Sequence, residues 1–254
     1  MQLVDSHCHL EMIEDTAGAV AAARAAGVRQ LVTIGIDLET SRKAVELASA
    51  LDGVYATVGL HPHDADRLDD ATLEEFERLA ARPRVVAIGE AGLDFYRDLS
   101  PRDAQRRAFS AQIELARRTG LPLVVHVRDA GDEAMAQLAA GAGDLTVVMH
   151  CFSLPEHVDE CNERGYYASF AGNVTYKTAA GLREAAAGVR AERLLVETDA
   201  PFLAPVPNRG NSNVPAWVAL TAARVAEVRG VSAAELAGLT TGNARRVFGL
   251  AEAD

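Results

Sequence analysis

The sequence is short of cysteine and of long hydrophobic runs. Its three cysteines are an odd number without the spacing of a disulfide framework, which favours a reducing compartment and makes the cytoplasm the expected location. No apolar run approaches the length of a membrane span, and the chain begins without the basic and apolar regions of a signal peptide. We therefore expect no membrane partner, and no obligate protein partner is evident.

Positive charge is also scarce. The formal net charge of the 254 residues is -11. Broad attraction to duplex DNA or to an anionic membrane depends on many Lys and Arg side chains, so this composition argues against it. It does not exclude a nucleic acid that is held locally by metal ions.

What the sequence does contain is a regular alternation of short apolar runs with longer helical segments. Hydrophobic residues make up 49% of the chain and charged residues 24%, a mixture typical of globular proteins. The length suits one domain, residues 1–254. Strands are expected at residues 3–9, Gln30–Gly35, Val54–Leu60, Val85–Glu90, Pro122–Val127, Leu145–Cys151, Tyr166–Phe170 and Arg193–Thr198.

A helix is expected after each strand, which predicts parallel pairing through right-handed crossovers. Eight such units predict an α/β fold, a closed (β/α)8 barrel. The alternative is an open doubly wound sheet, but the Gly-rich phosphate turn that such a sheet has after its first strand is missing. Helix starts are predicted by capping boxes at Thr72–Glu75 and Ser232–Glu235, and by Ser100 as the N-cap before Pro101.

The motif Asp5-Ser-His-Cys-His9 ends the first expected strand. Side chains alternate across a strand, so His7 and His9 should point to one face and Cys8 to the other. Two imidazoles at this spacing can hold a divalent metal ion. By itself the pattern is more often just two polar residues near an exposed chain start.

The other histidines and two acids strengthen the metal hypothesis. In a (β/α)8 barrel the catalytic groups come from the C-terminal ends of the strands. Four imidazoles and two carboxylates fall at or near such ends and provide ligands for two divalent ions, with Glu90 placed to bridge them. For one member alone, such as His126, a core histidine is an equally good interpretation. The predicted metal ligands are His7, His9, Glu90, His126, His150 and Asp199.

Six motifs in order give the chain a family resemblance. They are Asp5-Ser-His-Cys-His9, Gly59-Leu-His-Pro-His63, Ile88-Gly-Glu-Ala-Gly-Leu-Asp-Phe95, His126-Val-Arg-Asp-Ala130, His150-Cys-Phe-Ser153 and Glu197-Thr-Asp-Ala-Pro201. Together they resemble the TatD family of metal-dependent deoxyribonucleases. The resemblance implies a TIM-barrel metallohydrolase that acts as a 3'-5' exonuclease on DNA, and the family's metal ligands match the six residues predicted above.

Two details bear on that resemblance. Many amidohydrolases bridge their metals with a modified lysine on the fourth strand, whereas this chain has Glu90 there, and its only lysines are Lys43 and Lys177. This favours the TatD-like branch. The family usually has a basic residue where Ser212 stands and often an acid where Val214 stands, so substrate affinity could differ.

Roles in catalysis follow from the predicted positions. A dinuclear site of Mg, Mn or Zn lowers the pKa of bound water and stabilises charge on a phosphodiester. Asp199 is expected either to orient or deprotonate that water or to act as a ligand only, and Glu90 is expected to be essential. Asp5 is expected to hydrogen-bond an imidazole, and Glu197 to pair with a ligand or a substrate group.

Substrate contacts are expected around the same site. His61 and His63 lie on a loop and suit phosphate binding or proton donation to the leaving oxygen. Arg128 and Arg209 are the cations placed to meet phosphates, and Phe95 and Tyr96 could stack a base. The expected substrate form is single-stranded or frayed DNA. These substrate-contact candidates are His61, His63, Arg128, Arg209, Phe95 and Tyr96.

Two other functions remain open. One is a hydrolase of another small ester, amide or phosphoester on the same dinuclear site, because barrels host many chemistries. The other is a noncatalytic protein that uses metal for structure or for binding a partner. The ligand set argues against the second, since structural sites are usually closed four-ligand cages.

Overall fold

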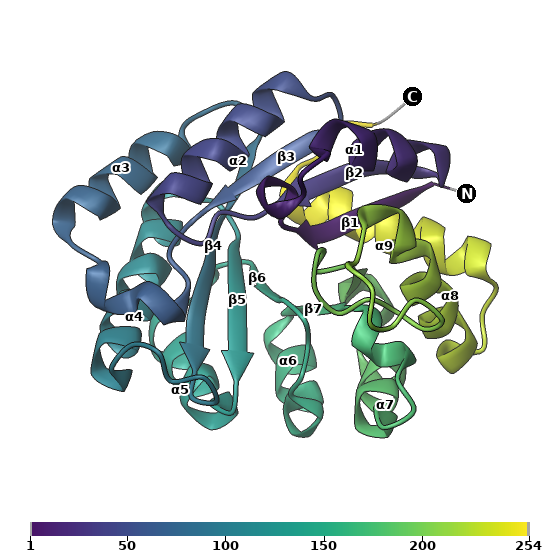
Figure 1. Ribbon diagram of the computed structural model, residues 1–254. Helices are drawn as coiled ribbons and strands as arrows, with labels where there is room; N and C mark the ends of the chain where they lie inside the picture. The colour runs from purple at the N-terminus through teal and green to yellow at the C-terminus, as the bar shows by residue number, and fades with distance from the viewer. Residues whose placement is uncertain (1, 253–254) are drawn as a thin grey trace. The chain divides into compact units, whose positions relative to one another are not determined.

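The computed structural model describes residues 2–252, and strands alternate with helices along this part of the chain (Figure 1). The strands are β1 (Leu3–Cys8), β2 (Val28–Thr33), β3 (Val54–Val58), β4 (Val85–Asp94), β5 (Leu123–Arg128), β6 (Val147–Met149), β7 (Tyr167–Phe170) and β8 (Leu194–Val196). The helices are α1 (Thr16–Ala25), α2 (Leu38–Ala50), α3 (Asp70–Ala80), α4 (Arg102–Thr119), α5 (Gly131–Gly141), α6 (Val158–Arg164), α7 (Ala180–Gly188), α8 (Val218–Arg229) and α9 (Ala233–Phe248).

The chain divides into two compact units. The first consists of Met1–Thr33 and Cys151–Asp254, and the second of Ile34–His150. Each unit contributes four of the strands described above and has its own set of helices. Within residues 2–252, no helix is both long enough and apolar enough to cross a membrane.

The second unit contains β3, β4, β5 and β6, which are neighbours in that order and pair in parallel. Helix α2 packs on β3 and α4 packs on β4. All ten residues of β4 are buried, as expected for a parallel strand covered by helices. Strand β4 is longer than predicted: it continues past Glu90 to Asp94, with an irregular register between Ile88 and Ala91.

The first unit contains the other four strands. β1 pairs in parallel with β2, and β7 with β8. An isolated parallel bridge between Cys8 and Ala200 joins the segment after β8 to the end of β1. Helix α9 contacts both β1 and β8, and Asn243 in α9 donates to the Leu194 carbonyl at the start of β8. The seventh expected strand, Tyr166–Phe170, is confirmed with a start one residue later.

Two of the three predicted helix starts are wrong. The N-cap of helix α3 is Asp69, three residues before the predicted N-cap Thr72. The Asp69 carboxylate accepts a hydrogen bond from the Thr72 amide. Helix α4 has Pro101 as its N-cap. Ser100 does not cap it because its hydroxyl donates to the His63 carbonyl instead. The capping box at Ser232 is confirmed.

Candidate metal-binding site

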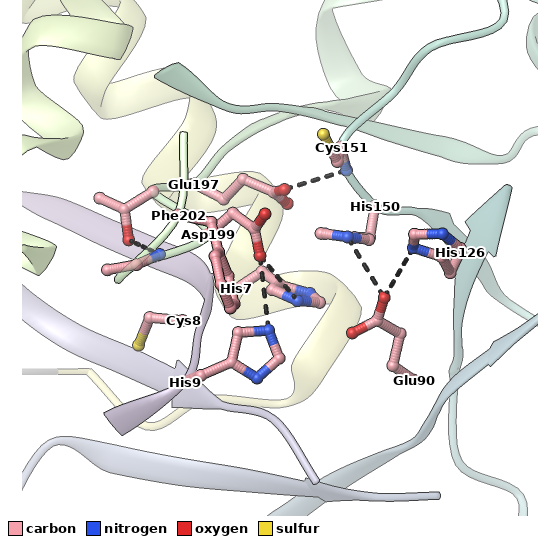
Figure 2. Close-up of polar contacts among 12 residues, drawn as sticks. His7, Cys8, His9, Glu90, His126, His150, Cys151, Glu197, Asp199 and Phe202 are labelled. Carbon is pink, nitrogen blue, oxygen red and sulfur yellow. Dashed lines mark hydrogen bonds and ion pairs between the residues drawn. The ribbon is translucent and has the colours of Figure 1, made fainter. Parts of the chain in front are cut away.

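In the first unit, two imidazoles converge on one carboxylate. His7 Nε2 lies 3.6 Å and His9 Nε2 3.4 Å from Asp199 Oδ1 (Figure 2). The two rings meet edge to face with their centroids 5.1 Å apart. Both histidines are buried. The predicted alternation at the end of β1 therefore brings His7 and His9 to the same carboxylate.

Backbone hydrogen bonds fix the segment that carries Asp199. The Asp199 amide donates to the His7 carbonyl at 2.9 Å, and the His9 amide donates to the Ala200 carbonyl at 2.7 Å. Asp199 has a φ of 55°, a left-handed conformation that Asp adopts more readily than most residues. These contacts hold the chain after β8 against the end of β1, so the carboxylate faces the two imidazoles.

The expected contact of Asp5 with an imidazole is wrong. Its carboxylate accepts from the Thr198 amide at 2.8 Å, from the Thr198 hydroxyl at 2.5 Å and from the His7 backbone amide at 3.4 Å. Burial raises the pKa of Asp5 to about 8, although the Thr198 hydrogen bonds act in the opposite direction. Asp5 thus ties the end of β8 to the backbone of His7.

In the second unit, three imidazoles surround Glu90. Its Oε1 lies 2.8 Å from His126 Nδ1, 3.4 Å from His150 Nε2 and 3.5 Å from His61 Nε2. Figure 2 shows the contacts with His126 and His150. Ligand atoms of His61, Glu90 and His126 all lie within 4.8 Å of one another. Imidazole nitrogen and carboxylate oxygen at this spacing suit a divalent transition metal, so these residues fit a metal site.

His61 was predicted as a phosphate contact, and the structure places it in this metal-capable group. It follows β3, and its amide donates to the Ile36 carbonyl at 2.8 Å. Its ring also contacts the ring of His126, with centroids 4.6 Å apart. The signal in the sequence was the same as for the predicted histidine ligands, a histidine at or soon after the end of a strand.

Glycines allow β4 to approach β5 on both sides of Glu90. Gly92 has a φ of 144°, and a Cβ at this position would overlap the carbonyl oxygen of His126. Gly89 has a φ of 123°, and a Cβ at this position would also overlap the carbonyl oxygen of Val124. Any L side chain would be strained in these conformations. The spacing Gly-Glu-Ala-Gly therefore sets the distance between Glu90 and His126.

Asp94 contacts two of the predicted site histidines, and the sequence reasoning gave it no role. Its Oδ2 lies 2.8 Å from His63 Nε2 and 3.5 Å from His126 Nε2. Burial by itself would raise the pKa of Asp94, but the hydrogen bonds from His126, from the Arg97 amide and from His63 hold it below its usual value. Asp94 therefore remains a carboxylate that links the two imidazoles.

The pKa of His126 responds to the same contacts. Burial lowers it, but the hydrogen bonds with Asp94 and Glu90 outweigh burial, so the pKa of His126 is raised. A metal ion needs the neutral imidazole, so its binding at His126 would compete with a proton.

Glu197 is held by a backbone contact. Its Oε1 accepts from the Cys151 amide at 2.9 Å, as Figure 2 shows.

Cys8 is buried, and its thiol donates to the Val32 carbonyl at 3.5 Å. None of the metal-capable groups found among residues 2–252 includes a cysteine.

The predicted substrate cations each lie over a tyrosine ring. The Arg128 guanidinium carbon is 3.9 Å from the centroid of Tyr96, and that of Arg209 is 4.4 Å from the centroid of Tyr176. Both arginines are exposed. Phe95 differs from Tyr96 because it is half-buried. The guanidinium carbon of Arg102 lies 4.3 Å from the centroid of the Phe95 ring, so Phe95 packs on α4.

Comparison with known proteins agrees with the motifs. The family model described as TatD related DNase matches residues 4–249. The uncharacterized metal-dependent hydrolase YabD of Bacillus subtilis (strain 168) is 39% identical over 251 residues, covering 97% of this chain and 98% of YabD. The 3'-5' ssDNA/RNA exonuclease TatD of Enterobacter lignolyticus (strain SCF1) is 39% identical over 248 residues, with 95% of each chain covered.

A solved structure shares the fold. The TatD homologue YjjV from Escherichia coli K12 superposes with a TM-score of 0.92 at 28% identity, and the match covers 98% of each chain. The predicted (β/α)8 barrel is confirmed. The chain belongs to the TatD family of metal-dependent hydrolases.

Proposed function

We propose that the protein is a 3'-5' exonuclease that hydrolyses phosphodiester bonds of DNA with two divalent metal ions. The observation that carries the proposal is the pair of imidazole–carboxylate groups, one around Asp199 and one around Glu90. Family membership supports it, because some relatives of similar length are named as 3'-5' ssDNA/RNA exonucleases.

The proposed ligands come from both units. Functional residues of a (β/α)8 barrel gather at the C-terminal ends of its strands, so we propose that the group around Asp199 and the group around Glu90 would both supply ligands for the divalent ions. His61 is an additional candidate beside Glu90. The ions are Mg, Mn or Zn, since mixed nitrogen and oxygen ligands suit all three. The assigned ligands are His7, His9, Glu90, His126, His150 and Asp199.

When bound, the two ions act as Lewis acids on the phosphate and make water a better nucleophile. Asp199 orients the attacking water and accepts its proton. His63 is held through Nε2 by Asp94 at 2.8 Å. This leaves Nδ1–H of the doubly protonated His63 ring to donate to the phosphate or to the leaving oxygen. The exposed guanidinium groups of Arg128 and Arg209 bind phosphates.

We propose single-stranded or frayed DNA ends as the substrate. At a net charge of -11 the protein lacks the basic surface that follows a duplex. The test uses enzyme that is stripped of metal and reloaded with each ion, acting on single-stranded, blunt duplex and closed circular DNA over a salt series. We expect cleavage from single-stranded ends, with a salt slope for roughly two or three phosphates. Rapid cleavage of circular duplex with a steep salt slope would overturn the proposal.

A second candidate is hydrolysis of another small ester, amide or phosphoester. The negative net charge and the uncharged Ser212 in the loop after β8 favour it. The same reloaded enzyme, assayed on simple phosphoesters, carboxylic esters and amides, separates the two. Metal-dependent turnover of one of these without turnover of DNA would select this candidate.

We also propose that residues 1–254 act as one domain in the cytoplasm. Among the described residues no disulfide joins Cys8, Cys151 or Cys161, which fits a reducing compartment. A single cooperative unfolding transition of the metal-loaded protein is the expected result for one domain. Two separate transitions, one for each unit, would contradict the single domain.

A further inference from the structure

An exposed tyrosine follows the strand that carries Glu90. Tyr96 lies in the turn after β4 and is 60% exposed. An aromatic ring left in water forgoes the stabilisation that burial would provide. This makes Tyr96 a candidate for contact with a ligand.

One face of the Tyr96 ring is covered by a cation. The guanidinium carbon of Arg128 lies 3.9 Å from the ring centroid. Arg128 is itself exposed. The pair therefore offers an aromatic surface and an available positive charge side by side.

The turn that contains Tyr96 is held by the carboxylate of Asp94. Oδ1 of Asp94 accepts from the amides of Tyr96 at 3.0 Å and Arg97 at 2.8 Å. The other oxygen of the same carboxylate contacts His63 and His126. The Phe95 amide donates to the Arg128 carbonyl at 2.9 Å, which joins the turn to the end of β5. Asp94 thus connects the backbone of Tyr96 to His63 and His126, two predicted site histidines.

We infer that Tyr96 and Arg128 form a stacking platform for one nucleobase of a single-stranded substrate, next to the scissile phosphodiester. The base stacks on the Tyr96 ring while Arg128 binds an adjacent phosphate. Bases inside a duplex are covered on both faces by their neighbours, so the platform favours single strands and frayed ends over intact duplex. The inference rests on the proposed nuclease function and adds a subsite to it.

The test compares variants of the metal-loaded full-length enzyme on two oligonucleotides. One is single-stranded DNA, and the other is the same strand with abasic nucleotides at its 3' end. Y96L removes the aromatic ring, and Y96F keeps it. L99A is the matched control, because Leu99 is 65% exposed in the same connection between β4 and α4 and has no aromatic face.

On the normal strand we expect Y96L to raise KM about tenfold with kcat little changed, because it loses the binding energy of one base stacked on an aromatic ring. Y96F and L99A should resemble the native enzyme. On the abasic strand the native enzyme should already show the higher KM, and Y96L should raise it no further. An unchanged KM of Y96L on the normal strand, or an equal loss on both strands, would overturn the platform.

Failure of the platform can be told apart from failure of the nuclease function. If the native enzyme cleaves DNA and Y96L behaves like it, the platform alone is wrong. If no DNA is cleaved, fluorescence anisotropy of both labelled strands with each variant provides the answer. A roughly tenfold weaker binding of the normal strand by Y96L, without change for the abasic strand, then supports the platform, and equal binding rejects it.

Discussion

Replacing Glu90 with Gln tests the centre of the proposed metal site. Glu90 is only 2% exposed, and its Oε1 faces three imidazole nitrogens at 2.8 to 3.5 Å. Glutamine has almost the same shape but is neutral, so the substitution removes the charge and leaves the packing in place. Its amide nitrogen is a donor and cannot bind a metal ion in place of a carboxylate oxygen.

Two magnitudes follow for E90Q. In the metal-free protein, the loss of a hydrogen bond to a charged group costs about 2 kcal/mol, which for a chain of this length lowers Tm by roughly 5 °C. Metal affinity should fall much further. Removing a residue that only supports a ligand already weakens binding about ten- to a hundredfold, so removing a ligand should cost at least about a hundredfold.

The assay measures metal content and hydrolysis on the same samples. E75Q is the control, because Glu75 lies on the surface of α3 in pairs with Arg42 and Arg78 and its replacement changes the net charge equally. We expect E75Q to retain metal and activity and E90Q to lose both while its circular dichroism remains native. Full metal content and full activity in E90Q would remove Glu90 from the site.

Three further predictions test the surroundings of the site. G92A should reduce both Tm and activity, because its Cβ would overlap the His126 carbonyl. The control G238A, in open space on α9, should raise the unfolding free energy by about 1 kcal/mol. Thermal unfolding distinguishes the two variants, and a native Tm for G92A would contradict the argument. C8S should keep its metal and most activity while H9A loses both, since the Cys8 thiol bonds the Val32 carbonyl; equal metal loss in both would refute this. When the metal concentration is a hundredfold above Kd, chelation with EDTA should lower the unfolding free energy of the native enzyme by about 2.7 kcal/mol. The unfolding free energy of E90Q should not change, and a similar fall in E90Q would show that the ion binds elsewhere.

Much of the site could be predicted because its signals are local. The two-residue alternation at the end of β1 was enough to place His7 and His9 together, and the contact of both with Asp199 agrees with it. The strand–helix alternation predicted the barrel, because each strand and helix has its own hydrophobic period. The Ser232 cap also depends on neighbours within one helical turn, and it was predicted correctly.

Only the tertiary structure determined where several polar groups find partners. Asp5 bonds Thr198, 193 residues away, instead of an imidazole. Ser100 turns from the helix start to the His63 carbonyl, 37 residues away. Buried polar groups must be satisfied, and the partner that satisfies them can come from any part of the chain that folding brings near. Asp94 illustrates the same reason: β4 extends to it only because glycines let that strand lie against β5, and there it meets His63 and His126.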